Sequence, residues 1–404
     1  MDFSDTASET EFRQTARAWI QGNAPTYLAA PLSGSGFGST RTGDFDPIAE
    51  AKKWQKTKAD AGWACIQWPK EYGGRGATPI ESVIWSQEEG IYGKLSGTFI
   101  IGQGMCAPTM MAYAGEEAKL RYLPKLASGE EIWCQLFSEP HGGSDLAGLR
   151  TKAVKDGDTW VINGQKIWTS GAQYADWMFA LVRTDPSAAK HEGISFVLLD
   201  MHQAGVTVKP IGLISGSSPF CETFLDNATA HRADLIGELN KGWTIGKRLL
   251  QFERSGIGGL SGAANKKKAV KTNPLADIAK RYIGDHDGKI GDADYREKIL
   301  KHSMTERAFQ LTTSRVVQEN QSGQTPGATT SIFKLVGSTL ARDGAALKSE
   351  LMGAQGLGWE GEGFEDKEIE TTRGWLNARA VTIYGGTNEV QMNIIGKRVL
   401  GLPD

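Results

Sequence analysis

Two segments have the spacing of ligand-binding loops, but neither stands in the context that such a loop needs. Residues 356–361 spell the GxGxxG pattern of a dinucleotide-binding turn. That turn follows a strand and opens a helix, whereas these glycines follow the helix-like stretch 340–355. Residues 285–292 resemble an acidic metal loop but lack the ligand spacing of a calcium loop. We therefore predict no dinucleotide-binding turn at 356–361, and a polar turn between helices at 285–292.

Three further segments bring together polar groups, glycines and aromatic rings. Residues 135–145 read Gln-Leu-Phe-Ser-Glu-Pro-His-Gly-Gly-Ser-Asp, and residues 163–170 read Asn-Gly-Gln-Lys-Ile-Trp-Thr-Ser. Residues 383–391, near the end of the chain, read Ile-Tyr-Gly-Gly-Thr-Asn-Glu-Val-Gln. What these segments do depends on the elements that position them.

Those elements follow the order helices, strands, helices. Apolar and charged residues recur at helical spacing in 46–62 and 116–127, and Ser8 with Glu11 forms a capping box that predicts the start of the first helix. The helical pattern returns after Gly242 and continues almost to the end of the chain.

The middle of the chain is rich in β-formers. Asn163-Gly164 separates two such runs within 159–168, which predicts a β-hairpin turning at these two residues. Three more short strands are predicted at 177–183, 193–200 and 205–210. Several short strands at this spacing indicate a barrel or a sandwich.

In this order and on this layout, the three segments resemble the signatures of acyl-CoA dehydrogenases: a T/S-E-P-x-x-G-S-D loop, an N-G-x-K-x-W-[IT]-[TS] strand and a terminal Y-x-G-T-[NS]-E/Q-[IV]-Q. The resemblance covers nearly the whole chain. It implies an α+β multidomain fold with an N-terminal α-helical domain (1–131), a middle β-barrel or sandwich domain (132–241) and a C-terminal four-helix-bundle domain (242–404). The implied activity is FAD-dependent formation of an α,β double bond in an acyl-CoA thioester.

The resemblance places the flavin ring between two strand edges. Position by position, the contacts fall on Gln135, Phe137, Ser138, Trp168, Thr169 and Ser170. An isoalloxazine ring needs an apolar wall and a few fixed donors and acceptors. The indole of Trp168 would be that wall, although taken alone it would be interpreted as a core aromatic.

Other positions correspond to the far end of the cofactor. Thr387 and Glu389 match residues near the adenine dinucleotide. Gly353 and Gln355 resemble a loop that reaches the FAD of a neighbouring subunit. These matches imply an oligomer: a homo- or heterotetramer, or a dimer.

The base that removes the α-proton must lie elsewhere than in many relatives, which carry a glutamate directly after the terminal tyrosine. This chain has Gly385 there, whose backbone N–H would instead help to polarise the thioester carbonyl. Gln251-Phe-Glu-Arg254 resembles the segment that supplies the base in isovaleryl- and long-chain acyl-CoA dehydrogenases, so Glu253 is the predicted base. Arg254 and Ser144 match substrate-contacting positions. As plain alternatives, Glu253 and Arg254 would form structural ion pairs, and Ser144 would be a turn residue.

The chain departs from the common pattern in a second way, because it has no R-x-x-F-G signature after the first C-terminal helix and carries a basic loop at 263–274 instead. It thus resembles dehydrogenases of bulky acyl-CoAs, such as steroid side chains, or of dicarboxylic acyl-CoAs. Gly102 and Gly104 lie in 98–111, which aligns with a helix that lines the acyl pocket. They would leave room for a long, branched or ring-bearing acyl group, or else only allow close helix packing.

Composition limits the remaining classes of function. The net charge is −2, with 45 basic and 47 acidic side chains, which argues against a nucleic-acid-binding or membrane-surface protein. The four cysteines form no CxxC pair and the six histidines have no metal-ligand spacing, so we expect reduced thiols and no metal site. The polar, acidic start of the chain and the lack of an apolar run of about 20 residues predict a cytoplasmic protein without a membrane span.

Three rival interpretations remain open at this point. An acyl-CoA oxidase would share the fold but reoxidise FAD with O₂ rather than with an electron-transfer flavoprotein. A flavin-binding subunit of a heteromeric acyl-CoA dehydrogenase would bind FAD without needing Glu253. A nucleic-acid-associated flavoprotein of the same fold would show salt-dependent DNA binding.

Overall fold

The first of two structural units holds the β-rich core. The computed structural model describes residues 5–29, 45–90, 92–257, 273–321 and 329–403. The chain divides into one unit of Met1–Gly212 with Ser218–Glu253, and a second of Leu213–Ser217 with Arg254–Asp404.

The helices of the first unit are α1 (Ala7–Asn23), α2 (Pro47–Asp60), α3 (Pro79–Glu89), α4 (Ala107–Tyr113), α5 (Glu116–Ser128) and α6 (Gly242–Ile257), with short 3₁₀ turns between them and a π-helical turn at Gly102–Cys106. Three helices of the first unit begin at a capping side chain: Thr6 caps α1, Asp46 caps α2 and Thr78 caps α3. The expected capping box at Ser8 and Glu11 is wrong, because Thr6 and Glu9 form the capping box that opens α1. Both pairs fit the S/T-x-x-E spacing, and Thr6 is the one that has extended backbone immediately before the helix.

The strands form an eight-stranded sheet. Their bounds are β1 (Trp133–Leu136), β2 (Lys152–Asp156), β3 (Thr159–Ser170), β4 (Trp177–Arg183), β5 (Ile194–Asp200), β6 (Val206–Ile211), β7 (Phe220–His231) and β8 (Leu235–Ile236). The order is β6-β7-β3-β2-β4-β5-β8, and β1 pairs with β4 in parallel. The strands predicted at 177–183, 193–200 and 205–210 are confirmed within a residue or two.

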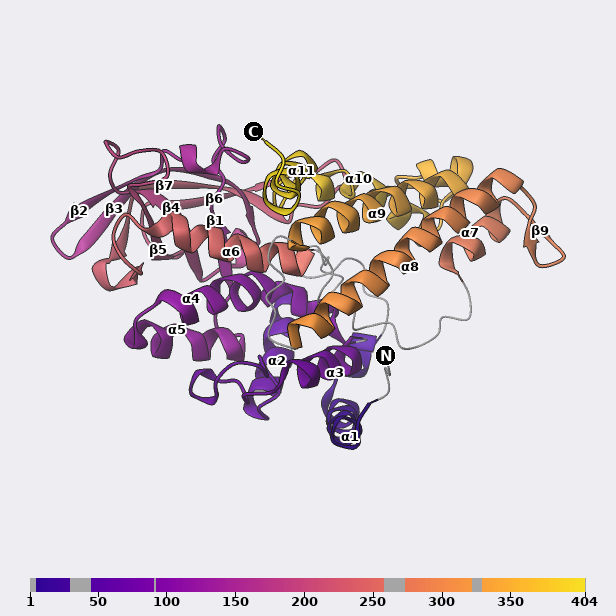
Figure 1. Ribbon diagram of the computed structural model, residues 1–404, viewed down its shortest axis with the longest axis horizontal. Coiled ribbons are helices and arrows are strands. Elements are labelled where there is room, and N and C mark those ends of the chain that lie inside the picture. Colours follow the sequence, from indigo (N-terminus) through magenta and orange to yellow (C-terminus); the bar gives the residue numbers. More distant parts are fainter. Residues whose placement is uncertain (1–4, 30–44, 91, 258–272, 322–328, 404) are drawn as a thin grey trace. The chain divides into compact units, whose positions relative to one another are not determined.

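Alternate residues of β4 serve two cores. Met178, Ala180 and Val182 face one apolar cluster with residues of β3 and β7, whereas Phe179 and Leu181 face a second cluster. That second cluster includes residues of α4, α5 and α6, the helices drawn along one side of the sheet in Figure 1. A strand buried on both faces reads as a continuous apolar run, which is why Trp-Met-Phe-Ala-Leu-Val marked β4 so clearly.

The predicted hairpin at Asn163-Gly164 is wrong. Strand β3 runs through these residues, and the turn lies earlier, between the end of β2 at Asp156 and the start of β3 at Thr159. Asn163 instead bonds across to Asn227, accepting a hydrogen bond from its backbone N–H at 2.8 Å. The pairing of β3 with β7 shifts its register there, because Asn163 lies opposite two residues of β7, Asp226 and Asn227; the extra residue is a bulge in β7, and β3 makes no turn.

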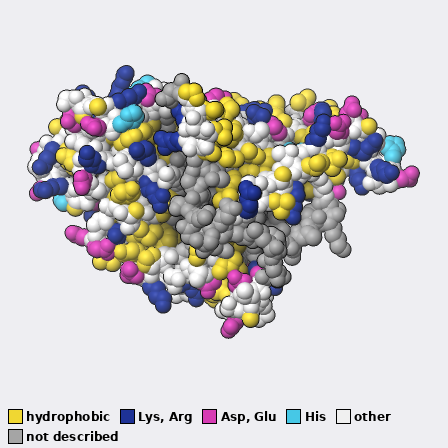
Figure 2. Space-filling view, in the orientation of Figure 1, with side chains coloured by type: hydrophobic (Ala, Val, Ile, Leu, Met, Phe, Trp, Pro, Cys, Tyr) yellow, Lys and Arg dark blue, Asp and Glu magenta, His cyan; other side chains and the backbone are white. Residues whose placement is uncertain are grey.

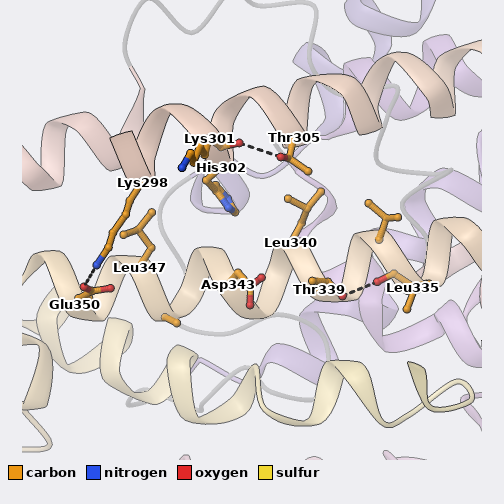
Figure 3. A pocket seen from close by; sticks show the side chains of 12 residues that line it. Lys298, Lys301, His302, Thr305, Leu335, Thr339, Leu340, Asp343, Leu347 and Glu350 are labelled. Carbon is orange, nitrogen blue, oxygen red and sulfur yellow. Dashed lines mark hydrogen bonds and ion pairs between the residues drawn. The ribbon is translucent and has the colours of Figure 1, made fainter. Parts of the chain in front are cut away.

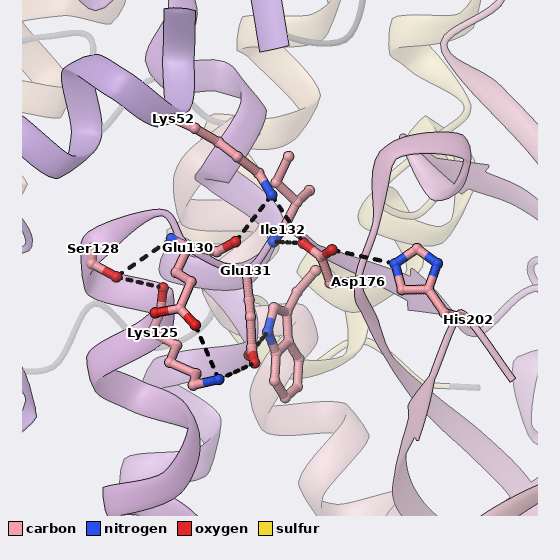
Figure 4. Close-up of polar contacts among 9 residues, drawn as sticks. Lys52, Lys125, Ser128, Glu130, Glu131, Ile132, Asp176 and His202 are labelled. Atoms are coloured by element: carbon pink, nitrogen blue, oxygen red, sulfur yellow. Dashed lines mark hydrogen bonds and ion pairs between the residues drawn. The ribbon is translucent and has the colours of Figure 1, made fainter. Parts of the chain in front are cut away.

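A polar network fixes the start of β1. Asp176 accepts hydrogen bonds from the backbone N–H of Ile132 at 2.8 Å and from Lys52 at 3.3 Å, and His202 lies 3.3 Å from its other oxygen. Lys52 also donates to the carbonyl of Glu130 at 3.0 Å. Figure 4 shows Asp176 between Lys52 and His202. Helix α2 and the starts of β1 and β4 are thereby held together.

The second unit is mainly helical. It comprises α7 (Pro274–Tyr282), the strand pair β9 (Asp285–His286) and β10 (Lys289–Ile290), α8 (Ala293–Gln321), α9 (Thr329–Leu351), α10 (Asp366–Asn377) and α11 (Asn388–Ile394). The predicted polar segment 285–292 between helices contains the short β9–β10 hairpin. Residues 353–357, which open the GxGxxG stretch, form a 3₁₀ turn after α9, so no strand precedes those glycines. The basic loop 263–274 lies outside the described residues except for its last two.

Three general features bear on function. Within the described ranges, no helix is long and apolar enough to cross a bilayer, and no cluster of three metal-ligand side chains occurs. All four cysteines are free thiols. On the face shown in Figure 2, the described basic and acidic side chains are interspersed and form no continuous basic surface.

Candidate active site

Strand β1 brings a predicted flavin contact next to the predicted base. Gln135 is half-buried at the β1 edge, and its side-chain nitrogen lies 3.5 Å from a carboxylate oxygen of Glu253 on α6. The two residues are far apart in sequence, and the common packing of β1 and α6 against β4 brings them together. The side chain of Arg254 lies outside the described residues.

Phe137 and Ser138, the two residues after β1, differ in burial. The Phe137 ring is buried, edge-on to Phe179 and Phe196, so only its backbone can face a ligand. Ser138 is half-buried, and its carbonyl accepts the backbone N–H of Ile167 at 3.0 Å. That hydrogen bond joins the 135–138 edge to β3 just before Trp168.

Trp168 is an exposed tryptophan on a strained backbone. Its φ is +62°, a left-handed value that is rare for a bulky residue, and 53% of its surface is exposed. A register shift between Ile167 and Thr169 turns the indole out of the sheet, with its face at an angle of 85° to the Phe220 ring. Strain of this kind persists only where the surroundings fix it, which makes Trp168 a candidate ligand contact.

The two residues after Trp168 both follow that shift, and they differ in burial. Thr169 is buried, and its hydroxyl donates to the carbonyl of Cys221 and pairs with the Thr223 hydroxyl, both at 2.9 Å. Its side chain is therefore engaged inside the sheet. Ser170 is half-buried where β3 pairs with the start of β7. Of the residues predicted to contact the flavin, some can therefore offer a side chain, whereas Phe137 and Thr169 can offer only their backbone.

The 139–151 segment carries Ser144 and is closed by a carboxylate. Ser144 is exposed. Glu139 is buried and accepts the backbone N–H groups of Arg150 at 2.7 Å and Thr151 at 2.9 Å. It also forms an ion pair of 2.9 Å with Lys166, which has no exposed surface.

Burial and the partner's charge act on this pair in opposite directions. Burial alone would raise the pKa of Glu139, but Lys166, Thr151 and the backbone N–H of Arg150 hold it below its ordinary value. Burial lowers the pKa of Lys166, and Glu139 opposes that shift. Sequence reasoning missed both residues, although both stand inside the motifs. A glutamate and a lysine in such motifs are normally interpreted as exposed, and no local signal reveals that they meet.

The predicted residues of the second unit occupy the ends of its helices. Thr387 caps α11 and accepts the backbone N–H of Val390 at 3.2 Å, and Glu389 is exposed in the first turn. The backbone N–H of Glu389 itself and the Thr387 hydroxyl lower the pKa of Glu389. Gly385 has a φ of +68°, a conformation that disfavours any residue with a side chain.

Gly353 and Gln355 follow α9 in a 3₁₀ turn. Gly353 is exposed with a φ of +55°, whereas Gln355 is half-buried. The side-chain oxygen of Gln355 is buried and has no hydrogen-bond partner among the described residues. An unsatisfied buried acceptor of this kind needs a donor that the described residues do not supply.

A groove of about 540 Å³ in the second unit is a different feature. It runs between α8 and α9, and Figure 3 shows His302 and Asp343 entering it from the two helices. Leu335, Leu340 and Leu347 give it an apolar lining. No residue predicted to bind cofactor or substrate lines the groove, so we do not place the active site there.

Comparison with known proteins identifies the family. Models of the acyl-CoA dehydrogenase N-terminal, middle and C-terminal domains match residues 6–130, 134–228 and 240–400. The acyl-CoA dehydrogenase IpdE1 of Mycobacterium tuberculosis is 34% identical over 394 residues, which cover 97% of each chain. The chain belongs to the acyl-CoA dehydrogenase family.

Solved structures of acyl-CoA dehydrogenases share the fold. The Tcur3481-Tcur3483 steroid ACAD matches with a TM-score of 0.79 and 27% identity, covering 100% of both chains. The ChsE4-ChsE5 complex from Mycobacterium tuberculosis matches with a TM-score of 0.76 and 28% identity, again over 100% of both chains. The predicted α+β fold with its helical, β and helical parts is confirmed, and the protein is an oxidoreductase of the acyl-CoA dehydrogenase type.

Proposed function

We propose that this acyl-CoA dehydrogenase uses FAD and that Glu253 removes the α-proton of the acyl thioester. The contact between Gln135 and Glu253 carries the proposal, because it sets a carboxylate beside the strand edge assigned to the flavin. When bound, FAD would supply the acceptor for the hydride that leaves the β-carbon. The proton would go to a carboxylate oxygen of Glu253 and leave the α,β double bond behind.

The residues fit an isoalloxazine ring. The exposed indole of Trp168 offers an apolar face. Half-buried polar groups are offered by Gln135 on β1, by Ser138 just after β1, and by Ser170 at the end of β3. Thr387, Glu389, Gly353 and the unsatisfied oxygen of Gln355 remain our assignments for the dinucleotide end. The middle domain, which we bound at 132–241 between domains 1–131 and 242–404 of the sequence, would thus present the ring.

The thioester end of the substrate is assigned to backbone and hydroxyl groups. Ser144 is exposed on the 139–151 segment, where a hydroxyl can reach a bound thioester. Gly385 lacks a carboxylate, and its left-handed φ is a reason why a glutamate would be disfavoured there. Its N–H is assigned to the thioester carbonyl, and Arg254 to substrate binding. The base function therefore falls to α6 rather than to the terminal tyrosine segment.

Partners follow from the family and from the relatives. We propose an electron-transfer flavoprotein as electron acceptor, a homo- or heterotetramer or a dimer in which Gln355 reaches a neighbouring subunit's FAD, and a cytoplasmic location in keeping with four free thiols. One of the similar solved structures is a steroid ACAD. On that likeness we propose a ring-bearing acyl-CoA as the substrate.

A product assay tests the reaction. The purified chain is incubated with short, long, branched and steroid-bearing acyl-CoAs and an artificial electron acceptor, and products are analysed by mass spectrometry. We expect one class to lose two hydrogens. Stoichiometric O₂ consumption without the acceptor would instead identify an acyl-CoA oxidase, and an unchanged panel would contradict the proposal.

Replacing Trp168 by alanine should weaken FAD binding about tenfold. An aromatic contact of this kind contributes about 0.5–1.5 kcal/mol beyond its buried area, and 1.4 kcal/mol is a factor of ten in affinity. The dissociation constant is measured by flavin fluorescence. Trp243→Ala is the control, because Trp243 contacts His191 rather than the assigned site. An equal loss in both variants would refute the role of Trp168.

The two glycines before α4 differ in role. A Cβ at Gly102 would lie 2.6 Å from Leu126 Cδ2 and 3.1 Å from Trp133 Cβ, so Gly102 allows close packing. Gly104 is exposed, and a Cβ there would meet only Ile100, at 3.6 Å. Of the two glycines, only Gly104 would therefore leave space for a bulky acyl group.

Leucine substitutions separate these roles. We expect Gly104→Leu to raise the KM for ring-bearing acyl-CoAs selectively with an unchanged Tm. Gly102→Leu should lower the free energy of unfolding by about 1–3 kcal/mol through overpacking. The checks are steady-state kinetics across the panel and thermal unfolding. Loss of all substrates in parallel in Gly104→Leu would count against the acyl-pocket assignment.

A further inference from the structure

One buried ion pair links the two motif segments of the first unit. Lys166 has no exposed surface, and its ammonium group contacts Glu139 at 2.9 Å, the carbonyl of Leu181 at 2.8 Å and the carbonyl of Phe137 at 3.1 Å. A lysine ammonium has three N–H donors. All three are therefore used, by β4, by the residue after β1 and by the 139–151 segment.

Glu139 closes the segment that carries Ser144. Besides Lys166, its carboxylate accepts the backbone N–H groups of Arg150 and Thr151, at the far end of the segment. Its own backbone N–H and carbonyl are paired with Gly142 at 3.1 and 2.9 Å. One side chain thus fixes both ends of the loop, while Ser144 between them stays exposed.

Lys166 also stands two residues before Trp168. The left-handed backbone of Trp168 is held from the N-terminal side by Lys166 and by the Ile167–Ser138 hydrogen bond, and from the C-terminal side by the buried Thr169 hydroxyl. A strained conformation persists where neighbours determine it from both sides. The ammonium group of Lys166 therefore helps to hold both the loop that carries Ser144 and the backbone that carries the exposed indole.

A contribution to folding stability does not explain why this site has a buried ion pair. A buried ion pair can often be replaced by apolar or neutral groups without loss of stability, because removing both charges from water costs about as much as their attraction returns. What such a replacement cannot reproduce is the set of directed hydrogen bonds that joins β3 to β4, to the end of β1 and to the 139–151 segment.

We propose that Glu139 and Lys166 are positioning residues, which set the Ser144 loop and the Trp168 indole at a fixed separation. Neither residue touches substrate or cofactor; each acts through the backbone it holds. The inference rests on the proposed function, since it assigns Ser144 to the thioester and Trp168 to the flavin. A misplacement of about 1 Å that is caused by a change far from the reacting atoms costs up to about a hundredfold in rate.

The test removes both charges at once. The FAD-loaded double variant Glu139→Gln with Lys166→Met is compared with the double variant Lys58→Met with Glu89→Gln. The control makes the same exchange at the 2.5 Å ion pair between α2 and α3, in which Lys58 is buried and Glu89 is half-buried. We expect the site variant to lose about a hundredfold in kcat/KM, mainly through KM, and to shift the visible absorption band of bound flavin. The control pair should leave KM and the band at wild-type values.

Each outcome decides between alternatives. Wild-type KM and spectrum in the site variant, or equal changes in both pairs, would overturn the inference. If the double variant does not fold, Glu139→Asp retains the charge and shortens the side chain, and it is expected to give the same KM and spectral changes; wild-type values there overturn the inference as well. Because the flavin band is read without turnover, this result stays distinct from a wild-type enzyme that oxidises no acyl-CoA, which would overturn the proposed function instead.

Discussion

Glu253→Gln is expected to slow reduction of bound flavin by acyl-CoA about 10²- to 10⁴-fold, the usual contribution of a positioned general base. Glutamine has the shape of glutamate and can still bond to Gln135, so we expect the variant to fold and to retain FAD. It cannot accept the α-proton. The rate is followed by anaerobic stopped-flow absorbance after mixing with substrate.

The matched control is a glutamate on another helix of the same unit. Glu11→Gln in α1 makes the same chemical change at an exposed position and should reduce flavin at the wild-type rate. A Glu253→Gln enzyme that keeps the wild-type rate would exclude Glu253 as the base. It would place the base on another residue of this chain.

Lys166→Met alone is expected to lower the free energy of unfolding by about 3–5 kcal/mol at neutral pH, because it leaves the buried Glu139 carboxylate without its partner. In the wild type the pKa of Glu139 is lowered on folding, so its stabilising contribution is present above the ordinary glutamate value of about 4.3 and is lost as the pH falls through the folded pKa. In the variant, burial dominates and raises that pKa, so protonation relieves the unpaired charge.

The difference between the two proteins should therefore shrink from neutral pH toward about pH 4. Urea unfolding followed by tryptophan fluorescence at both pH values measures it. Lys190→Met is the matched control, since the ion pair of Lys190 with Asp145 is exposed and contributes little. A stability loss that is independent of pH would contradict an ionised Glu139 in the folded state.

Helices and strands could be predicted from the sequence where the local residue pattern matches the burial that the fold imposes. The apolar run 177–183 gave β4, and the amphipathic stretch 116–127 gave α5 almost to the residue. Asn163-Gly164 misled because the pair favours left-handed and bulged backbone in general, and only the partner strand decides between a turn and a continuous strand. Here Asn227 of β7 provides that partner.

The candidate site was accessible only in part. Motif resemblance indicated Gln135, Glu253 and Trp168, and the structure brings the first two within 3.5 Å. It could not show that Thr169 turns its hydroxyl into the sheet, because inward and outward positions depend on the register shift at Trp168. Nor could it show the Glu139–Lys166 pair, which depends on three strands meeting at one point.

The central claim is that this chain, by itself, binds FAD and dehydrogenates an acyl-CoA. It is tested most directly by anaerobic titration of the FAD-loaded protein with the acyl-CoA panel while the visible flavin band is recorded. The account predicts that one class of acyl-CoA, expected to be ring-bearing, bleaches the band. It also predicts that Glu253→Gln shows no bleaching within the time in which the wild type is fully bleached. A protein that binds flavin but is bleached by no acyl-CoA would contradict the claim and identify this chain as one subunit of an enzyme completed by another.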